Sequence, residues 1–174
     1  MAIVNLSEIL HPKMDILFVA LNPPETSNSN GHYFSRNMSF WNLLYSSGLI
    51  TQAVKSPLMG DNEVFRCNNI NYKNSTWGIT DLVYDVVQTK SSRVKTNPNQ
   101  VYRILELLKS HEVKNMCFMH SKVGEAFECI SNLNRDQRYG LIGHIEDTAV
   151  YEIPFHNASI PDKHIEYKKL LKAL

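Results

Sequence analysis

The chain has 174 residues, of which 43% are hydrophobic and 20% are charged, and its formal net charge is +1. This length and composition fit one domain, residues 1–174, with a sizeable core. No stretch approaches the roughly 18–20 apolar residues that span a bilayer, and residues 1–12 lack the pattern of a secretory signal. We therefore expect a cytoplasmic protein with no membrane partner. The near-neutral charge is not typical of a strong nonspecific DNA binder, although a local basic patch would suffice for DNA.

The three cysteines, Cys67, Cys117 and Cys129, are too far apart in sequence for a zinc or iron–sulfur motif. We therefore expect neither a metal ion nor another cofactor. Cys117 lies in an apolar segment, which is typical of a small core residue.

The most informative segment is the apolar run at residues 16–21, which is followed by Asn22, two prolines and a polar loop at residues 25–30. A continuous apolar run without polar alternation predicts a strand covered on both faces, as in parallel sheets. Pro23 and Pro24 end this strand because neither can donate to a ladder. Asn22 then lies at the carboxyl end of a strand, where open α/β sheets bind ligands. An Asn at this position can also simply turn the chain.

Segments with helical and with strand character alternate along the rest of the chain. Apolar residues at helical spacing and flanking caps predict helices at residues 39–47, 99–110, 121–130 and 162–174. Short apolar runs predict strands at residues 115–120 and 149–153, and a short strand or a turn at residues 79–87. Residues 56–75 predict a loop. The expected N-caps of two helices are Ser39 and Ser121, and Gly48 is an expected helix stop.

Strands separated by helices favour parallel pairing through right-handed crossovers. The predicted fold is therefore a three-layer α/β/α domain around a central, mainly parallel sheet of about four strands.

Five segments occur in an order that one enzyme family shares. They are Ala20-Leu21-Asn22-Pro23-Pro24, Phe40-Trp41 followed by Gly48, and residues 77–83, 116–127 and 153–159. Together they resemble the mismatch-specific uracil- and thymine-DNA glycosylases, a branch of the uracil-DNA glycosylase superfamily, over nearly the whole chain. The resemblance implies the same three-layer fold and hydrolysis of the N-glycosidic bond of uracil in DNA, in G·U mismatches. Ala20 and Pro24 depart from the family, which usually has glycines there.

The resemblance also implies roles for individual residues. Asn22 stands where the family has an Asn that positions the attacking water, and an Asp in this loop would activate the water more strongly. Either Phe34 or Tyr33 stacks on the extruded base, depending on whether one counts from Asn22 or back from Phe40-Trp41. His156 stands where some branches have a His that donates, in its neutral form, to the base oxygen that gains negative charge.

Further contacts follow from positions beside these motifs. Contacts to the base are expected from Leu21, Pro23, Asn157 and Ser159. Ser159 and Ile160 are also candidates for the wedge that fills the gap left by an extruded base. A Ser/Thr/Asn-rich loop carries three basic residues that either contact DNA phosphates or are simply solvated: Lys90, Arg93 and Lys95. Asp81, in the segment at residues 77–83, is expected to cap a helix or a turn.

We therefore predict a monofunctional, metal-independent and monomeric DNA glycosylase whose partner is DNA with uracil or another damaged or mismatched base. Three alternatives remain open. A protein of the same fold could bind a base or DNA without cleaving it, and the chain could also be a plain interaction module. A different α/β hydrolase that acts on nucleotides is disfavoured, because the sequence has no Gly-rich phosphate loop and no G-x-S-x-G elbow.

Overall fold

The fold is built on one five-stranded sheet with the strand order β2-β1-β3-β5-β4. The computed structural model describes residues 2–174. The strands are β1 (Lys13–Ala20), β2 (Trp77–Asp81), β3 (Glu112–Phe118), β4 (Gly140–Ile145) and β5 (Thr148–Glu152). Neighbouring strands pair in parallel except β4, which lies antiparallel to β5 at one edge. The predicted mainly parallel sheet is confirmed, with five strands in place of about four.

The apolar run of the sequence forms β1, which lies between β2 and β3. Ile16 and Phe18 belong to the core on one face of the sheet, and Leu17 and Val19 belong to the core on the other. All four side chains are fully buried. Because successive side chains of a strand point to opposite faces, one strand supplies both cores. This explains why the run has no polar alternation.

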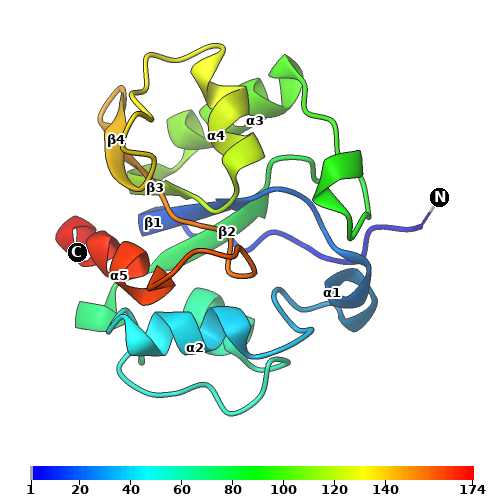
Figure 1. The fold of residues 1–174 in the computed structure, drawn as a ribbon, viewed down its shortest axis with the longest axis vertical. Coiled ribbons are helices and arrows are strands. Elements are labelled where there is room, and N and C mark those ends of the chain that lie inside the picture. The colour runs from blue at the N-terminus through cyan, green and yellow to red at the C-terminus, as the bar shows by residue number, and fades with distance from the viewer. Residues whose placement is uncertain (1) are drawn as a thin grey trace.

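Helices cover both faces, so the sheet is the middle one of three layers (Figure 1). One face carries α3 (Pro98–Ser110) and α4 (Ser121–Glu128), and the other carries α2 (Ser39–Ser46) and α5 (Lys163–Lys168). The predicted three-layer α/β/α arrangement is therefore confirmed. None of the helices within residues 2–174 combines the length and the apolar character needed to cross a bilayer.

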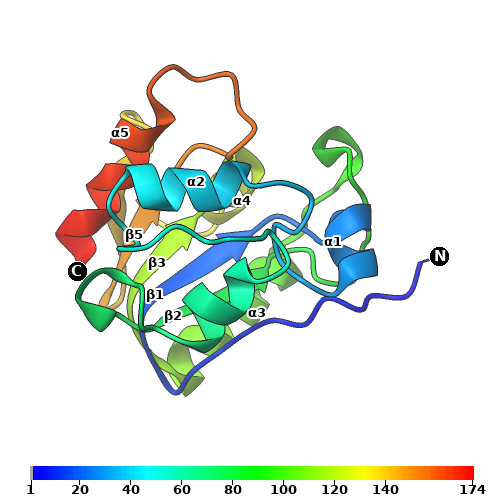
Figure 2. The same cartoon turned by 90° about the horizontal axis from the view of Figure 1, so that it is seen from below.

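Seen from the side of α2, this helix lies across the strands, and the N-terminal segment runs along the β2 edge (Figure 2). There Ile9 forms an isolated antiparallel bridge with Ile79 of β2. The short helix α1 (Glu25–Asn30) follows β1 after the two prolines and covers the residues predicted as a polar loop. The prediction of a loop at residues 25–30 is therefore wrong, because the whole segment is helical, and this helix stands beside the carboxyl end of β1.

The starts of two helices differ from the prediction by one residue. Ser39 is the first helical residue of α2 and not its cap, and its hydroxyl donates to the backbone carbonyl of His156 at 3.2 Å. Ser121 is the first residue of α4, and the cap is His120, whose Nδ1 accepts from the backbone N–H of Lys122 at 3.1 Å. Sequence rules for caps identify a serine by type, whereas in α4 it is the imidazole of His120 that reaches a free N–H group, and Met38, the N-cap of α2, makes no side-chain cap bond.

Other differences concern short elements. Residues 56–75 contain a π-helix (Asn62–Arg66) and a 3-10 helix (Tyr72–Asn74), and the C-terminal helix continues beyond α5 as a 3-10 helix (Lys169–Ala173). The segment predicted at 79–87 is a strand only as far as Asp81. Strand β4 has no counterpart in the sequence prediction, because Gly140 and Gly143 interrupt its pattern and Leu141 is 55% exposed at the sheet edge.

Candidate functional site

A cavity of about 160 Å³ opens at the carboxyl ends of the parallel strands. Strand β1 leads into it through Ala20, Leu21 and Asn22, β2 ends in it at Asp81, and β3 leads into it through Met119 and His120. The loop after β5, helix α1 with Pro24, and the segments at residues 33–37 and 88–91 complete the wall. Because the carboxyl ends of parallel strands meet at one edge, side chains that are far apart in the sequence converge here.

Asn22 is half-buried at this edge, and its carboxamide is held on one side only. Its Nδ2 donates to the backbone carbonyls of Pro23 (3.1 Å), Val86 (3.2 Å) and Gln88 (2.7 Å). No group within residues 2–174 donates to its Oδ1, so this oxygen can accept from a water or a ligand. The two interpretations of Asn22, as a residue that turns the chain and as one that contacts a ligand, are therefore compatible. Its nitrogen fixes the loop, and its oxygen is free to bind a ligand.

Both candidate stacking residues line the cavity, but they offer different groups. Tyr33 is 4% exposed and its hydroxyl donates to Oδ2 of Asp81 at 3.2 Å. Phe34 has a left-handed backbone with φ of +51°, and its carbonyl accepts from the indole N–H of Trp41 at 3.1 Å. The Phe34 ring lies 4.0 Å from the Phe40 ring, centroid to centroid. Tyr33 thus offers a tethered hydroxyl, and Phe34 offers an apolar ring.

Phe40 and Trp41 are fully buried and belong to the core. The indole of Trp41 has a second function in the local structure, since its N–H holds the strained turn at Phe34 in place. Helix α2, which carries Trp41, therefore fixes the conformation of the cavity wall at Phe34.

His156 comes from the loop after β5 and lies among aromatic rings. Its ring centroid is 4.3 Å from that of Phe155 and 5.3 Å from that of Phe34, with the latter pair at right angles. Burial, and to a lesser degree the charge of Lys163, lowers the pKa of His156 to about 4. The imidazole is therefore neutral at pH 7, with one N–H to donate and one nitrogen to accept.

His120 lines the same cavity, although the sequence prediction gives it no role. Because its Nδ1 accepts from the N–H of Lys122, its proton is on Nε2. Burial lowers its pKa, and so does the charge of Lys122. His120 is the last residue of the predicted strand at residues 115–120, so its position at a strand end is the signal that could have identified it.

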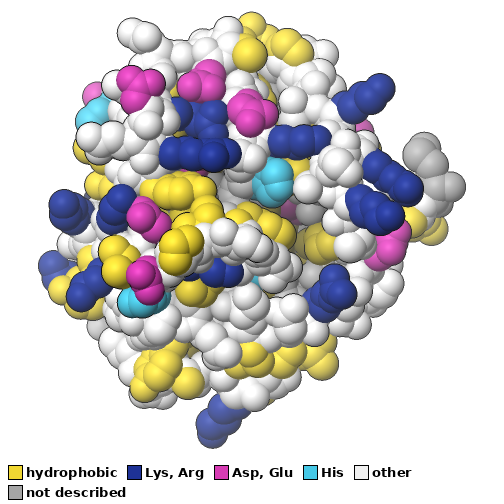
Figure 3. Space-filling view, in the orientation of Figure 1, with side chains coloured by type: hydrophobic (Ala, Val, Ile, Leu, Met, Phe, Trp, Pro, Cys, Tyr) yellow, Lys and Arg dark blue, Asp and Glu magenta, His cyan; other side chains and the backbone are white. Residues whose placement is uncertain are grey.

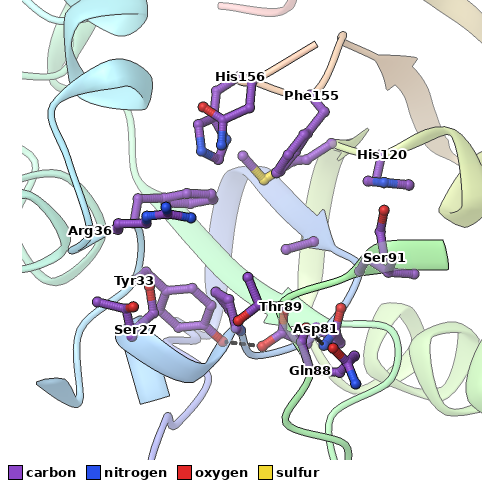
Figure 4. A pocket seen from close by; sticks show the side chains of 18 of the residues that line it. Ser27, Tyr33, Arg36, Asp81, Gln88, Thr89, Ser91, His120, Phe155 and His156 are labelled. Carbon is purple, nitrogen blue, oxygen red and sulfur yellow. Dashed lines mark hydrogen bonds between the residues drawn. The ribbon is translucent and has the colours of Figure 1, made fainter. Parts of the chain in front are cut away.

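Asp81 is the main correction to the predicted site. It neither caps a helix nor a turn, but ends β2 with its side chain only 3% exposed and facing the cavity. Burial raises its pKa to about 7, and the hydrogen bond from Tyr33 and the charge of Arg103 lower it by less. A carboxyl that titrates near neutrality in a cavity is a candidate functional group. Figure 4 shows Asp81 and Tyr33 on one side of the cavity, with His156, Phe155 and His120 across from them.

The structure brings some of the predicted site residues together and leaves others outside. The cavity is lined by Leu21, Asn22, Tyr33, Phe34, His156 and Asn157. Pro23 is buried without lining the cavity; its carbonyl instead accepts from the N–H of Gln88 at 3.0 Å. Ser159 and Ile160 follow in the loop beyond Asn157 and do not line the cavity either.

The predicted basic residues lie beside the cavity rather than in it. Lys90, Arg93 and Lys95 are exposed. Arg93 ends the short 3-10 helix Ser91–Arg93, whose Ser91 lines the cavity, and Lys90 and Lys95 lie on either side of this helix. Lys122 fixes this segment, because its Nζ donates to the carbonyls of Ser91 (2.7 Å) and Val94 (2.8 Å). Figure 3 shows several Lys and Arg side chains on the right of a hollow in which a histidine is visible.

The wall of the cavity also includes Arg36, which is exposed and which the sequence prediction does not single out. Within residues 2–174 no group of three His, Cys, Asp or Glu side chains could hold a metal ion. The polar groups that reach the cavity are therefore amides, hydroxyls, two imidazoles, one guanidinium and one carboxyl. Comparison of the chain with protein-family models and with curated proteins finds no match.

Proposed function

We propose that this protein is a monofunctional DNA glycosylase that hydrolyses the N-glycosidic bond of uracil in DNA, in G·U mismatches. The observation that carries the proposal is the convergence of Asn22, the Tyr33–Phe34 pair and His156 on one cavity. These residues come from three separate parts of the chain, and the resemblance to mismatch-specific glycosylases singles out the same ones.

The size of the cavity supports a single ring as its occupant. A cavity of about 150 Å³ is large enough to hold benzene, and the volume here is about 160 Å³. One pyrimidine ring therefore matches the space. Stacking on an aromatic side chain such as Phe34 is worth roughly 1–3 kcal/mol per base, which helps to offset the cost of extruding the base from the duplex.

The polar groups fit the demands of N-glycosidic bond hydrolysis. The oxygen Oδ1 of Asn22 accepts from a water and orients it toward the anomeric carbon C1′ of the sugar. The neutral imidazole of His156 donates its N–H to a base oxygen, where negative charge develops as the bond breaks. The electron pair of the C1′–N bond leaves with the base, the water oxygen bonds to C1′ as the water gives up one proton, and the base takes up a proton. The products are the neutral free base and an abasic site.

The basic segment at residues 90–95 supports a DNA partner. Lys90, Arg93 and Lys95 are exposed, and no ion pair within residues 2–174 involves them. Cations that are not paired within the protein can neutralise DNA phosphates and release counterions. Arg36 adds a further exposed cation at the wall of the cavity. A local patch of this kind is compatible with a net charge of only +1.

The experiment that tests the proposal is a cleavage assay on end-labelled duplexes with one G·U pair, followed by alkali. Wild-type protein is expected to break the labelled strand, and Asn22→Ala is expected to lose at least about 100-fold in rate, since it loses the water-orienting oxygen. The exposed Asn132→Ala is the matched control and should cleave like wild type.

Two results would contradict the proposal. Full activity of Asn22→Ala would refute the water-orienting role. Binding without strand breakage, on uracil, thymine and hypoxanthine in single and double strands, would instead support the catalytically silent base- or DNA-binding protein.

A further inference from the structure

The cavity contains a buried carboxyl, that of Asp81, which the mechanism above does not use. Asp81 pairs in register with Ala20, so it lies at the same sheet edge as Asn22, which is two residues further along the chain from Ala20. Asp is almost never fully buried unless it is paired. A group that departs from this rule at the edge where ligands bind requires a functional explanation.

The two oxygens of Asp81 have different surroundings. The hydroxyl of Tyr33 donates to Oδ2 at 3.2 Å, and no group within residues 2–174 donates to Oδ1. The guanidinium of Arg103 does not pair with the carboxyl; it binds the backbone carbonyl of Asp81, the hydroxyl of Thr80 and the carboxylate of Glu8. The oxygen Oδ1 is therefore the atom left to meet a ligand, and in the protonated carboxyl it can be a donor.

Asp81 and Asn22 lie at different depths in the cavity, and this difference separates their roles. Asn22 is half-buried and tied to the exposed segment at Val86, whereas Asp81 is only 3% exposed. An extruded nucleotide enters base first, because its sugar remains joined to the DNA strand. Asn22 therefore lies on the side of the sugar, and Asp81 lies where the base goes.

We propose that Asp81 is a second catalytic residue, which contacts the extruded base and donates a proton to it as the N-glycosidic bond breaks. This inference rests on the proposed glycosylase function. The electron pair of the C1′–N bond goes to the base, the Asp81 proton neutralises the base, and Asp81 becomes a carboxylate. Water adds to C1′, and the proton that this water releases restores the Asp81 carboxyl through solvent.

This role compensates for a weakness on the other side of the bond. Asn22 does not titrate, so it can orient water but cannot act as a base. Protonation of the departing base eases the loss of bases that are poorer leaving groups than uracil. The rate of the reaction then depends more on protonation of the departing base than on activation of the attacking water.

The protonated form is available near neutrality. Burial raises the pKa of Asp81 to about 7; Tyr33 and Arg103 lower it by less, and the charge of Glu8 adds to the rise. A general acid works best when its pKa lies near the working pH. The other titratable side chains of the cavity are Tyr33, Arg36, His120 and His156. Both imidazoles have lowered pKa values, so they are neutral in the range in which Asp81 titrates.

The test is the pH dependence of single-turnover cleavage of a G·U duplex between about pH 5.5 and pH 8.5. The wild-type rate should fall about tenfold per pH unit above about pH 7. Asp81→Asn should be at least about 100-fold slower at the low-pH plateau and should show no fall. Tyr33→Phe should move the fall to higher pH, since the Tyr33 hydrogen bond lowers the pKa of Asp81.

The matched control is Glu152→Gln. Burial also raises the pKa of Glu152 to about 7, but this residue does not line the cavity, so its removal should leave the pH profile of cleavage unchanged. A second comparison uses 5-fluorouracil, a better leaving group than uracil. Asp81→Asn should lose less rate on 5-fluorouracil than on uracil, an effect that a merely structural role would not produce.

The outcomes separate this inference from the proposed function. If wild type cleaves and Asp81→Asn retains the wild-type pH profile, or loses the same factor on both bases, then the acid role is wrong and the glycosylase stands. A wild-type rate that rises through pH 7 would also overturn it, because Asp81 would then act as a base. If wild type cleaves no base at all, both proposals fail. Thermal unfolding of each variant verifies that a lost rate is not a lost fold.

Discussion

Two buried carboxyls at the carboxyl edge of the sheet, Glu152 at the end of β5 and Asp81 at the end of β2, have different partners. Glu152 is 1% exposed and receives two hydrogen bonds from Arg135, from Nε at 2.9 Å and from Nη2 at 3.2 Å. Asp81 receives one, from the hydroxyl of Tyr33. Burial raises the pKa of both to about 7. The pKa alone therefore does not distinguish a structural carboxyl from a functional one.

The difference lies in what each carboxyl touches. Around Glu152 the space is filled: a Cβ added to Gly124 would lie 2.1 Å from its Oε1, and Arg135 also binds Glu128 at 2.9 Å. Around Asp81 a cavity is open, and one oxygen has no donor within residues 2–174. A buried carboxyl whose two oxygens both have partners in the protein has a structural role, whereas one with an unpaired oxygen at a cavity is available to a ligand.

The strongest way to break this comparison is to remove the partner of Glu152. Arg135→Ala leaves a buried carboxylate without its pair, which costs about 3–5 kcal/mol of unfolding free energy. We expect the loss in urea unfolding to be larger at pH 8 than at pH 6, because Glu152 can protonate in the more acidic buffer. Arg135→Ala with Glu152→Gln should recover part of the loss. As a control, Lys13→Ala removes one member of the exposed ion pair between Lys13 and Glu112 and should hardly change the free energy of unfolding. An equal loss in this control would refute the structural role of the Arg135–Glu152 pair.

The second prediction concerns the stability of Asp81→Asn as a function of pH. The folded pKa of Asp81 is raised from 3.8 to about 7, so the folded state holds the proton more tightly than the unfolded state. The contribution of the protonated Asp81 carboxyl to the free energy of unfolding is fully present below about pH 4 and is lost as pH rises through about 7. Relative to wild type, the variant should gain on the order of 1 kcal/mol per pH unit across that window and stay level above it. Urea unfolding at several pH values measures this difference, and no trend would mean that Asp81 is ionised throughout.

The third prediction concerns Asn22, which combines the two situations. Its Nδ2 has hydrogen-bond partners in the protein, as the carboxyl of Glu152 has, and its Oδ1 has none among the described residues, like Oδ1 of Asp81. By residue type alone, an Asp at this position should activate the water. In the structure, Asn22→Asp would place a carboxylate oxygen against the carbonyls of Pro23, Val86 and Gln88. We therefore expect a loss of about 1–3 kcal/mol and a slower cleavage rate. A faster, equally stable variant would show that the loop adapts and that water activation limits the rate.

How far the sequence predicts this protein depends on the range of the interactions. The apolar run of β1 predicts a doubly covered strand, and the alternation of elements predicts the layers, because both depend on local patterns. The same patterns place Asn22 at a strand end. They do not indicate β4, whose glycines and exposed Leu141 resemble a loop, and they place both helix caps one residue too late.

The site is predicted by residue type but not by environment. The strand-end position of Asn22 follows from the apolar run before it, whereas Tyr33, Phe34 and His156 are singled out only by the resemblance to the glycosylase family; all four line the cavity. Asp81 is overlooked because its importance comes from burial and from the hydroxyl of Tyr33, which is 48 residues away in the chain. No local pattern specifies such a contact; only the sheet register, which pairs Asp81 with Ala20, brings it to the ligand edge.

The smallest effect is expected from substitutions in the basic segment at residues 90–95. Here the comparison is between cations that have partners in the protein and cations that have none within residues 2–174. Lys122 donates to two carbonyls of the protein, whereas Lys90, Arg93 and Lys95 are exposed beside the cavity. If these three contact phosphates, each change to Gln should reduce the slope of log K against log salt by about 1, with a several-fold weaker affinity for duplex DNA. Fluorescence anisotropy over a salt series measures this slope.

The matched control for the basic segment is Lys172→Gln, an exposed lysine of the C-terminal 3-10 helix. It should leave the slope unchanged, because a cation away from the cavity would not meet a DNA strand whose base enters the cavity. The three substitutions should also weaken binding to uracil-containing and to normal duplexes by similar factors, since phosphate contacts carry no sequence information. A loss confined to the uracil duplex would instead assign these residues to the base, and the distinction between partnered and free polar groups would then extend from the cavity to its rim.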